Sequence, residues 1–198
     1  MTDALHELTE ATRDLILPWR NAPEVRRQMY TRHPISPEEH RTWFERMQAD
    51  PTRRWYLYLD AGDEPAGVVY FTDIEAEGGT AFWGFYARPE APAGTGKRIL
   101  YAALEHAFNE LGLHKLNGEV VATNTVSVHI HEQCGFTREG VFREQHFDGE
   151  QHVDIIRLGL LAREWPEHRE RLRERIAQLD ALAARREGES NPPPPANS

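Results

Sequence analysis

A short loop in the middle of the chain has the composition of a phosphate-binding site. It consists of Gly94, Thr95, Gly96, Lys97 and Arg98. Glycines let the backbone approach a ligand closely, and the free N–H groups at a helix start attract anions. The segment therefore predicts a pyrophosphate held by the backbone amides of residues 94–97, with Lys97 and Arg98 adding positive charge. The two glycines alone fit an ordinary tight turn equally well, and the loop lacks both the Walker and the dinucleotide-binding patterns.

A second group of polar residues surrounds a short helix expected over 126–134. Asn124 and Ser127 flank its start, and His131 follows Ser127 by one helical turn on about the same face. Because a histidine has an ordinary pKa of about 6.5, His131 is a candidate for proton transfer near neutral pH. The alternatives are a helix N-cap for Asn124 and a surface histidine at position 131.

The elements that would position these residues follow from hydrophobic periodicity. Strands are expected at 6–9, 55–59, 66–74, 81–87, 116–122, 138–147 and 151–161. Helices are expected at 37–49, 99–111 and 126–134, with one or two more within 14–29, broken at Pro18 and Pro23. Ser36 and Glu39 predict a capping box, and Asp148-Gly149 predicts a hairpin turn. This order predicts a three-layer α/β/α fold around a mixed, mostly antiparallel sheet.

The composition changes near Trp165, which predicts three parts in the chain. Residues 1–165 form the expected domain, residues 166–188 a charged helix, and residues 189–198, with four consecutive prolines, a disordered tail. We interpret the helix as one that packs on its own domain, with a partner-binding or homodimer helix as the alternative. Its apolar stripe consists of Leu172, Ile176, Leu179 and Ala183.

The bulk composition narrows the function classes. The formal net charge of -9 disfavours nucleic acid as a partner, because an acidic chain repels phosphate backbones. The single cysteine, Cys134, cannot form an internal disulfide. The chain has neither a signal-peptide pattern nor an apolar run of the roughly 20 residues that a membrane span needs. We therefore expect a cytoplasmic protein that does not bind membranes.

Together, the loop at 94–98 and the run from Asn124 to Phe136 resemble the GNAT superfamily of N-acetyltransferases over about residues 5–162. The family patterns are Gln/Arg-x-x-Gly-x-Gly/Ala and Asn-x-x-Ala/Ser-x-x-x-Tyr-x-x-x-Gly-Phe. This chain departs from them at two positions, where Ala91 replaces Gln or Arg and His131 replaces Tyr. The resemblance implies acetyl-CoA as co-substrate, no metal, and a sheet that is splayed at the acetyl-CoA site.

The resemblance also implies how the coenzyme binds. Its pantetheine arm would pair with the backbone of Phe85, Tyr86 and Ala87 between two splayed strands. Gly84 would permit the bulge that opens them, and a backbone N–H near Phe85 or Tyr86 would polarise the thioester carbonyl. Further contacts to pantetheine or to an ordered water would come from Asn124 and Ser127.

For proton transfer, the resemblance places His131 at the position of the acid that protonates the departing thiolate. The base is not readable from the sequence. Asp73 and Glu75, at the end of an expected strand, are candidates, and a solvated hairpin end is the preferred interpretation of both.

A narrower resemblance concerns the acceptor. Residues 19–23, Met29, Ile35, Glu39-His40 and 83–89 resemble the N-acetyltransferases of the pseudaminic acid pathway. These enzymes acetylate UDP-4-amino-4,6-dideoxy-N-acetyl-β-L-altrosamine, so the resemblance implies a UDP-amino sugar as acceptor. The implied pocket residues are Arg20, Met29, Tyr30, His40 and Thr72. The alternatives are a GNAT enzyme acting on a protein N-terminus or a small-molecule amine, and a non-catalytic module that binds acyl-CoA.

Overall fold

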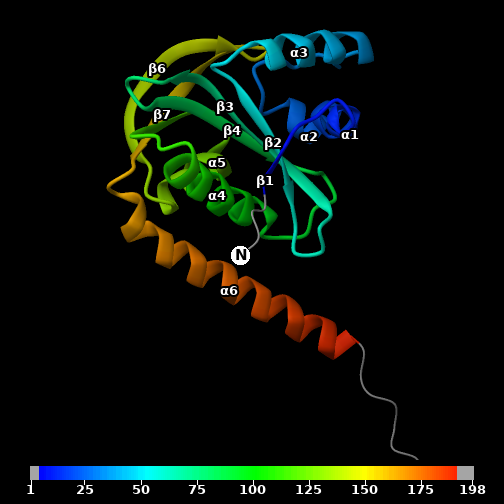
Figure 1. Cartoon of the computed structure of the whole chain (residues 1–198), viewed down its shortest axis with the longest axis vertical. Coiled ribbons are helices and arrows are strands. Elements are labelled where there is room, and N and C mark those ends of the chain that lie inside the picture. Colours follow the sequence, from blue (N-terminus) through cyan, green and yellow to red (C-terminus); the bar gives the residue numbers. More distant parts are fainter. Residues whose placement is uncertain (1–4, 191–198) are drawn as a thin grey trace, which may run out of the picture.

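A mixed seven-stranded sheet forms the centre of the computed structural model, which describes residues 5–190, without the side chains of 183, 184 and 186–190 (Figure 1). The strands follow the order β1-β2-β3-β4-β5-β7-β6, and only β4 and β5 are parallel neighbours. Their bounds are β1 Leu5–Glu7, β2 Arg54–Leu59, β3 Pro65–Glu75, β4 Thr80–Ala87, β5 Lys115–Val121, β6 Thr137–Phe147 and β7 His152–Leu161. The predicted mixed, mostly antiparallel sheet is therefore confirmed.

Helices cover both faces of this sheet and complete the three predicted layers (Figure 1). One face carries α1 (Arg13–Asn21), α2 (Pro23–Arg26) and α3 (Pro37–Ala49). The other carries α4 (Thr95–Glu105) with its π-helical extension His106–Glu110, α5 (Thr125–Gln133) and α6 (Trp165–Ser190). None of the helices within residues 5–190 has the length and apolar character of a membrane span.

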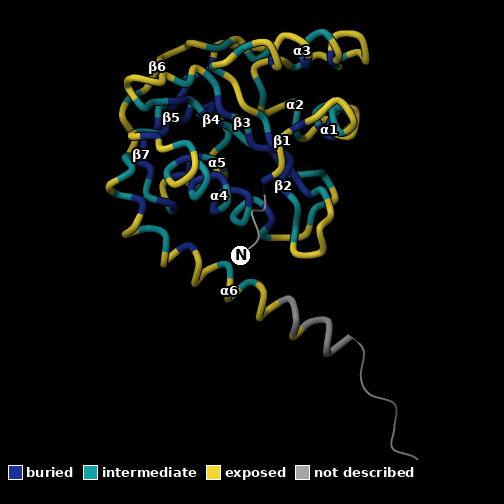
Figure 2. Tube along the Cα trace, in the orientation of Figure 1, coloured by how far each residue is buried: buried dark blue, intermediate teal, exposed yellow. Residues whose placement is uncertain are grey.

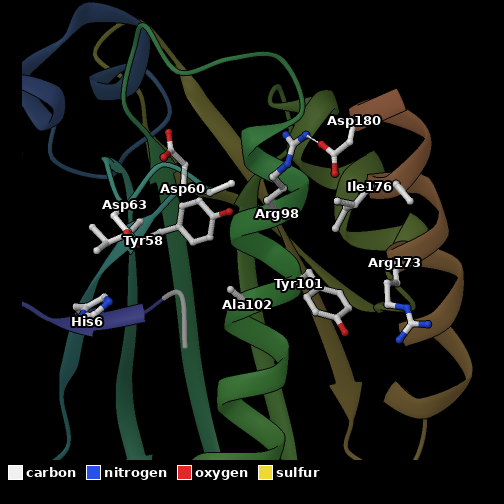
Figure 3. A pocket seen from close by; sticks show the side chains of 13 residues that line it. His6, Tyr58, Asp60, Asp63, Arg98, Tyr101, Ala102, Arg173, Ile176 and Asp180 are labelled. Carbon is white, nitrogen blue, oxygen red and sulfur yellow. Dashed lines mark hydrogen bonds and ion pairs between the residues drawn. The ribbon is translucent and has the colours of Figure 1, made fainter. Parts of the chain in front are cut away.

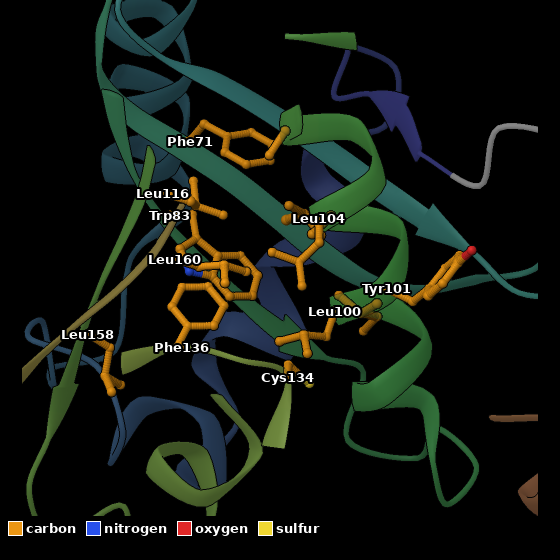
Figure 4. Packing of buried hydrophobic residues seen from close by; sticks show 14 of the residues in the cluster. Phe71, Trp83, Leu100, Tyr101, Leu104, Leu116, Cys134, Phe136, Leu158 and Leu160 are labelled. Atoms are coloured by element: carbon orange, nitrogen blue, oxygen red, sulfur yellow. The ribbon is translucent and has the colours of Figure 1, made fainter. Parts of the chain in front are cut away.

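Two hydrophobic cores result because side chains alternate between the faces of each strand. The larger core packs β3, β4, β5 and β7 against α4, α5 and α6, with Phe71, Leu104 and Leu158 fully buried (Figure 4). The smaller core packs α1 and α3 against the opposite face of β2, β3 and β4 through Ile16 and Phe44. Figure 2 shows the buried residues concentrated in the inner strands of the sheet, whereas the edge strand β6 is largely exposed.

Of the helices on the smaller core, α3 confirms a sequence prediction and α1 contradicts one. At α3, Ser36 Oγ accepts from Glu39 N (3.2 Å) and Glu39 Oε2 accepts from Ser36 N (2.8 Å), which confirms the capping box. The expected break at Pro18 is wrong, because α1 continues through this residue. Ile16 and Trp19, on either side of Pro18, are buried, and their burial offsets the one backbone hydrogen bond that proline removes.

The C-terminal helix α6 packs on its own domain over the residues from Trp165 to Asp180. Leu172 is 3% exposed, and Ile176 packs against the larger core. Trp165 Nε1 and Arg169 Nη2 each donate to the Glu105 carboxylate at the end of α4, both at 2.7 Å. Of the tail expected at 189–198, residues 189 and 190 belong to α6, and residues 191–198 lie outside the described residues, as does the side chain of Ala183.

Gly84 has a different function from the bulge that we expected. The β3–β4 register runs regularly through the Tyr70–Gly84 pair, and its irregularity lies between Thr72 and Glu75. A Cβ at Gly84 would lie within 2.1 Å of the Tyr70 hydroxyl oxygen. Tyr70 is itself stacked on Trp55 with 4.3 Å between ring centroids. Gly84 therefore provides the space for the Tyr70 ring.

We predict that Gly84→Ala lowers the free energy of unfolding by about 1–3 kcal/mol, because the stacked Tyr70 ring has to move. Gly140→Ala in β6 is the matched control, since no atom lies within 4 Å of a Cβ at that strand glycine. Urea denaturation of both variants measures the difference. Equal effects of the two substitutions would contradict this explanation of Gly84.

Candidate active site

The two parallel strands in the middle of the sheet pair over only three residues. Thr80–Phe82 of β4 register with Lys115–Asn117 of β5, and Asn117 Nδ2 donates to Ala81 O (3.2 Å). Beyond Phe82, β4 pairs only with β3, and β5 pairs only with β7. The edge of Trp83–Ala87 that faces β5 therefore has no strand partner. An unpaired strand edge can accept an extended ligand through main-chain hydrogen bonds, and Phe85, Tyr86 and Ala87 lie on it.

The glycine loop leads from this edge into α4. Gly94 has a φ of +90°, which glycine adopts readily, and it is the N-cap residue of α4. Thr95 N and Lys97 N already donate within the turn, to Pro92 O (3.1 Å) and Gly94 O (3.0 Å). The N–H groups of Gly94 and Gly96 have no hydrogen-bond partner within residues 5–190. Two of the four predicted amides are thus available for an anion.

Helix α6 occupies part of the same loop. Arg98 of α4 forms an ion pair with Asp180 of α6, and Figure 3 shows the two side chains pointing toward each other. A Cβ at Gly94 would lie 3.0 Å from Leu179 Cδ1. A cavity of about 650 Å³ lies beside the pair, between α4, α6 and residues 58–63. Arg98 is therefore engaged by a carboxylate, whereas Lys97 forms no ion pair within the described part of the chain.

The residues around α5 adopt a definite hydrogen-bond pattern. Asn124 Oδ1 accepts from Ser127 N (3.1 Å), so Asn124 caps the helix. His131 is 4% exposed, and its Nδ1 lies 2.7 Å from Ser127 O. Because a carbonyl only accepts, Nδ1 carries the hydrogen, and Nε2 of the neutral ring carries a lone pair. Burial lowers the pKa of His131, although the Ser127 hydrogen bond opposes this. The resting form is therefore neutral rather than the cation expected of a donor.

An aromatic environment surrounds Nε2 of His131. The ring centroids of Trp83 and Phe136 lie 5.3 and 5.0 Å from that of His131. A Cβ at Gly118 would lie 3.5 Å from His131 Nε2 and 3.4 Å from Trp83 Nε1. Gly118 is the first β5 residue after the pairing with β4 ends. Two ring nitrogens therefore approach the point at which the central strands part.

The opposite face of the sheet carries a cavity of about 520 Å³ between α1–α3 and β2–β4. Arg20, Met29, Tyr30 and His40 line it, as predicted for an acceptor pocket, whereas Thr72 is not among its lining residues. Arg20 Nη2 donates to a backbone carbonyl (2.9 Å), but its Nη1 is buried without a partner among the described residues.

His40 has a structural place in this cavity. Its Nε2 lies 2.7 Å from Arg13 O, and its ring stacks on Trp43 with centroids 5.1 Å apart. The hydrogen bond joins α3 to α1, so His40 fixes the wall of the cavity and offers only its remaining ring atoms to a ligand.

The sequence interpretation missed Glu119 of β5. Its carboxylate accepts from the Tyr30 hydroxyl (2.8 Å) and from Arg157 Nη2 (2.8 Å). With Tyr30, it lines a second cavity, of about 420 Å³. The available signal was a single charged residue inside the otherwise uncharged run at 116–122. Asp73 and Glu75, the candidates for the base, lie exposed at the far end of β3.

No group of three or more His, Cys, Asp or Glu side chains within the described residues is arranged to hold a metal ion. On one face of the sheet, the polar atoms near the parting strands are those of Trp83, His131 and the loop amides. On the other face they are those of Arg20, Tyr30 and Glu119. The arrangement has an anion-binding loop, a proton-accepting nitrogen and a polar cavity around a single opening in the sheet.

Comparisons with known proteins agree with this arrangement. A family model described as "Acetyltransferase (GNAT) domain" matches residues 4–137. Acetyltransferase PseH of Campylobacter jejuni is 27% identical over 131 residues, which cover 66% of this chain and 80% of that protein. Spermidine N(1)-acetyltransferase of Vibrio cholerae is 29% identical over 113 residues, which cover 57% of this chain and 65% of the relative.

The fold is also similar to that of a solved acetyltransferase structure. The crystal structure of spermidine N-acetyltransferase from Vibrio cholerae in complex with CoA and spermine superposes with a TM-score of 0.76 at 24% identity. The matched region covers 81% of this chain and 96% of the Vibrio cholerae chain. From the family match, which spans most of the sheet and both central helices, we conclude that this chain belongs to the GNAT family of acetyltransferases.

Proposed function

We propose that this acetyl-CoA-dependent N-acetyltransferase acts on the amino group of a nucleotide-linked amino sugar. By the resemblance to the pseudaminic acid pathway, the acceptor would be UDP-4-amino-4,6-dideoxy-N-acetyl-β-L-altrosamine. The relatives named PseH and spermidine N(1)-acetyltransferase match at similar identity, so the acceptor has to be argued from the site. The charge of the acceptor cavity is the observation that carries the proposal.

Most of the ionisable side chains that line this cavity, among aromatic and apolar ones, are basic. The basic residues are Arg20, His33, His40 and Arg53, and Glu39 is the only acidic one among the described lining residues. Glu39 is already hydrogen-bonded to His33 and to the Ser36 amide. Arg20 Nη1 has no partner among the residues described, and the planar guanidinium is well suited to phosphate oxygens. The cavity thus favours a substrate with a diphosphate over a polyamine.

The amine of such a substrate would lie at Glu119. Tyr30 lines both acceptor-side cavities, so a ligand that extends from Arg20 past Tyr30 reaches the Glu119 carboxylate. Glu119 and His131 lie on opposite sides of the opening between β4 and β5. Gly118 faces His131, and Glu119, the next residue of the strand, points to the opposite face of the sheet. We assign to Glu119 the binding of the ammonium group and the removal of its first proton, which passes to solvent.

The coenzyme side fits an acyl-CoA in three respects. The unpaired edge of Phe85–Ala87 offers main-chain groups to the pantetheine, and the amides of Gly94 and Gly96 offer donors to the diphosphate. Lys97 offers a cation that forms no competing ion pair with the residues that the structure describes. Acetyl-CoA supplies the thioester that the acceptor amine attacks. Arg98 already forms an ion pair with Asp180. To bind phosphate, Arg98 would have to break this ion pair or contact both groups at once.

His131 would act as a proton relay. Its Nε2 lone pair accepts a proton from the amine nitrogen during attack on the thioester carbon. When the C–S bond breaks, the same Nε2–H protonates the thiolate, so the imidazole returns to its neutral form. The products are the N-acetylated acceptor and CoA with a free thiol. This role retains the thiolate-protonating function that the sequence predicts for His131.

The acceptor class is tested by thiol release with acetyl-CoA and a panel of amines. We expect turnover of UDP-4-amino sugars to exceed that of spermidine and of N-terminal peptides. Arg20→Ala should raise KM for the nucleotide sugar by about tenfold or more, because a hydrogen bond to a charged group contributes about 1.5–3 kcal/mol. The KM for acetyl-CoA should stay constant. Arg41→Ala, which removes an exposed arginine of α3, is the matched control.

Preference for spermidine or a peptide would contradict the nucleotide-sugar assignment and leave the acetyltransferase assignment intact. Binding of acetyl-CoA with no thiol release across the whole panel would favour the non-catalytic acyl-CoA-binding alternative. An Arg20→Ala effect of equal size on both substrates would show that Arg20 does not act on the acceptor specifically.

The relay predicts the pH dependence of turnover. Because His131 must start neutral and burial lowers its pKa from 6.5, kcat should be constant at neutral pH and fall on a limb below pH 6.5. His131→Ala should lower kcat by about 10²- to 10⁴-fold and remove this limb. His131→Tyr should retain activity, since a phenol also donates a proton to a thiolate. Persistence of the acid limb in His131→Ala would assign it to another group.

A further inference from the structure

Trp83 has a buried hydrogen-bond donor that no described residue satisfies. Its side chain is 5% exposed, and its Nε1 is buried without a partner. Leaving such a donor unpaired costs about 1–3 kcal/mol, and buried tryptophans usually find an acceptor. Trp165, which is buried to a similar extent, donates its Nε1–H to Glu105 (2.7 Å). The unpaired N–H of Trp83 therefore needs an explanation beyond packing.

The surroundings of Trp83 fix the direction of this N–H. The indole stacks on Phe85 and Phe136, with centroid separations of 5.3 and 5.7 Å and interplanar angles of 17° in both cases. Figure 4 shows Trp83 packed beside Phe136 within the larger core. An indole stacked on two rings cannot rotate to another acceptor without losing both contacts, so its donor is preorganised.

The indole N–H of Trp83 lies where the two central strands part. Trp83 is the first residue of β4 beyond the pairing with β5, and Gly118 is its counterpart on β5. Trp83 Nε1 and His131 Nε2 lie at 3.4 and 3.5 Å from one point, where a Cβ of residue 118 would be. Because residue 118 is a glycine, no side chain of its own fills the space beside the two nitrogens. One unpaired donor and one unpaired acceptor thus border the same small space.

We propose that Trp83 is a catalytic residue whose indole N–H donates a hydrogen bond to the thioester carbonyl oxygen of acetyl-CoA. This inference rests on the proposed acetyltransferase function. As the amine nitrogen bonds to the carbonyl carbon, the C=O electron pair moves onto oxygen, which accepts from Trp83 Nε1. The proton of the amine passes to His131 Nε2. The oxygen pair then reforms C=O, the C–S bond breaks toward sulfur, and His131 protonates the sulfur.

The environment makes this hydrogen bond effective. Phe85, Phe136 and the core residues behind them exclude water, so a developing negative charge is weakly screened there. Asn117 Nδ2 is bonded to Ala81 O, and His131 Nδ1 is bonded to Ser127 O. Of these side-chain donors around the parting strands, only the N–H of Trp83 remains free to meet the oxygen.

Trp83→Phe tests the proposal, because phenylalanine keeps the stacking and removes the donor. We expect kcat to fall about 10²-fold, as for loss of one oxyanion donor, with KM for acetyl-CoA nearly unchanged. The melting temperature should fall only by the cost of the smaller buried ring, since the donor that disappears is an unsatisfied one. The control Trp165→Phe loses a satisfied hydrogen bond, so it should lower the melting temperature and leave kcat unchanged. A Trp83→Phe enzyme with kcat within about threefold of the original would overturn the proposal.

Nuclear magnetic resonance gives a second test that needs no turnover. The chain has five tryptophans, so the indole N–H spectrum has five expected signals, and the signal missing from Trp83→Phe identifies Trp83. Acetonyl-CoA, a ketone analogue, should move that signal downfield, whereas CoA without a carbonyl should not. Equal shifts with the two ligands would refute the carbonyl contact. A wild-type protein that shows the ketone-specific shift but releases no thiol would refute the proposed function and retain the contact.

Discussion

The loss of pairing between β4 and β5 after Phe82 and Asn117 is the constraint on which the rest of the site depends. Backbone N–H and C=O groups in a sheet need partners, and the edge of β4 beyond Phe82 has none from β5. An extended ligand can supply such partners. Helices α4 and α5 begin after the two strands that separate there. The helix caps at Gly94 and Asn124 each follow the end of one of these two strands.

The two faces of β5 separate the two halves of the chemistry. Gly118 and Glu119 are neighbours in sequence, and the alternation of a strand directs them to opposite faces. Gly118 leaves space for the ring nitrogens of Trp83 and His131, whereas Glu119 lies with Tyr30 on the acceptor face. A short step along one strand thus joins an apolar, water-excluding environment to a polar cavity. Proton transfer across the sheet needs no long relay in this arrangement.

Local sequence signals predicted the elements well and the site in part. The capping box at Ser36, the glycine at position 94 and the hairpin at 148–149 follow from short-range rules, and the structure contains all three. Contacts between distant segments were not readable. Glu119 meets Tyr30 across 89 positions and Arg98 meets Asp180 across 82, so no spacing rule indicates either pair. The free N–H of Trp83 and the tautomer of His131 likewise depend on packing that exists only in the folded chain.

Helix α6 has a consequence for how the boundaries of this protein are drawn. The family match ends at residue 137, yet Asp180 and Leu179 reach back to the first turn of α4. A shortened chain that ended after β7 would keep every strand, but Arg98 would lose its carboxylate and Gly94 its apolar cover. Nucleotide affinity measured on such a fragment would describe a more cationic, more open loop than that of the whole molecule. The segment outside the shared fold is in this sense part of the binding equilibrium.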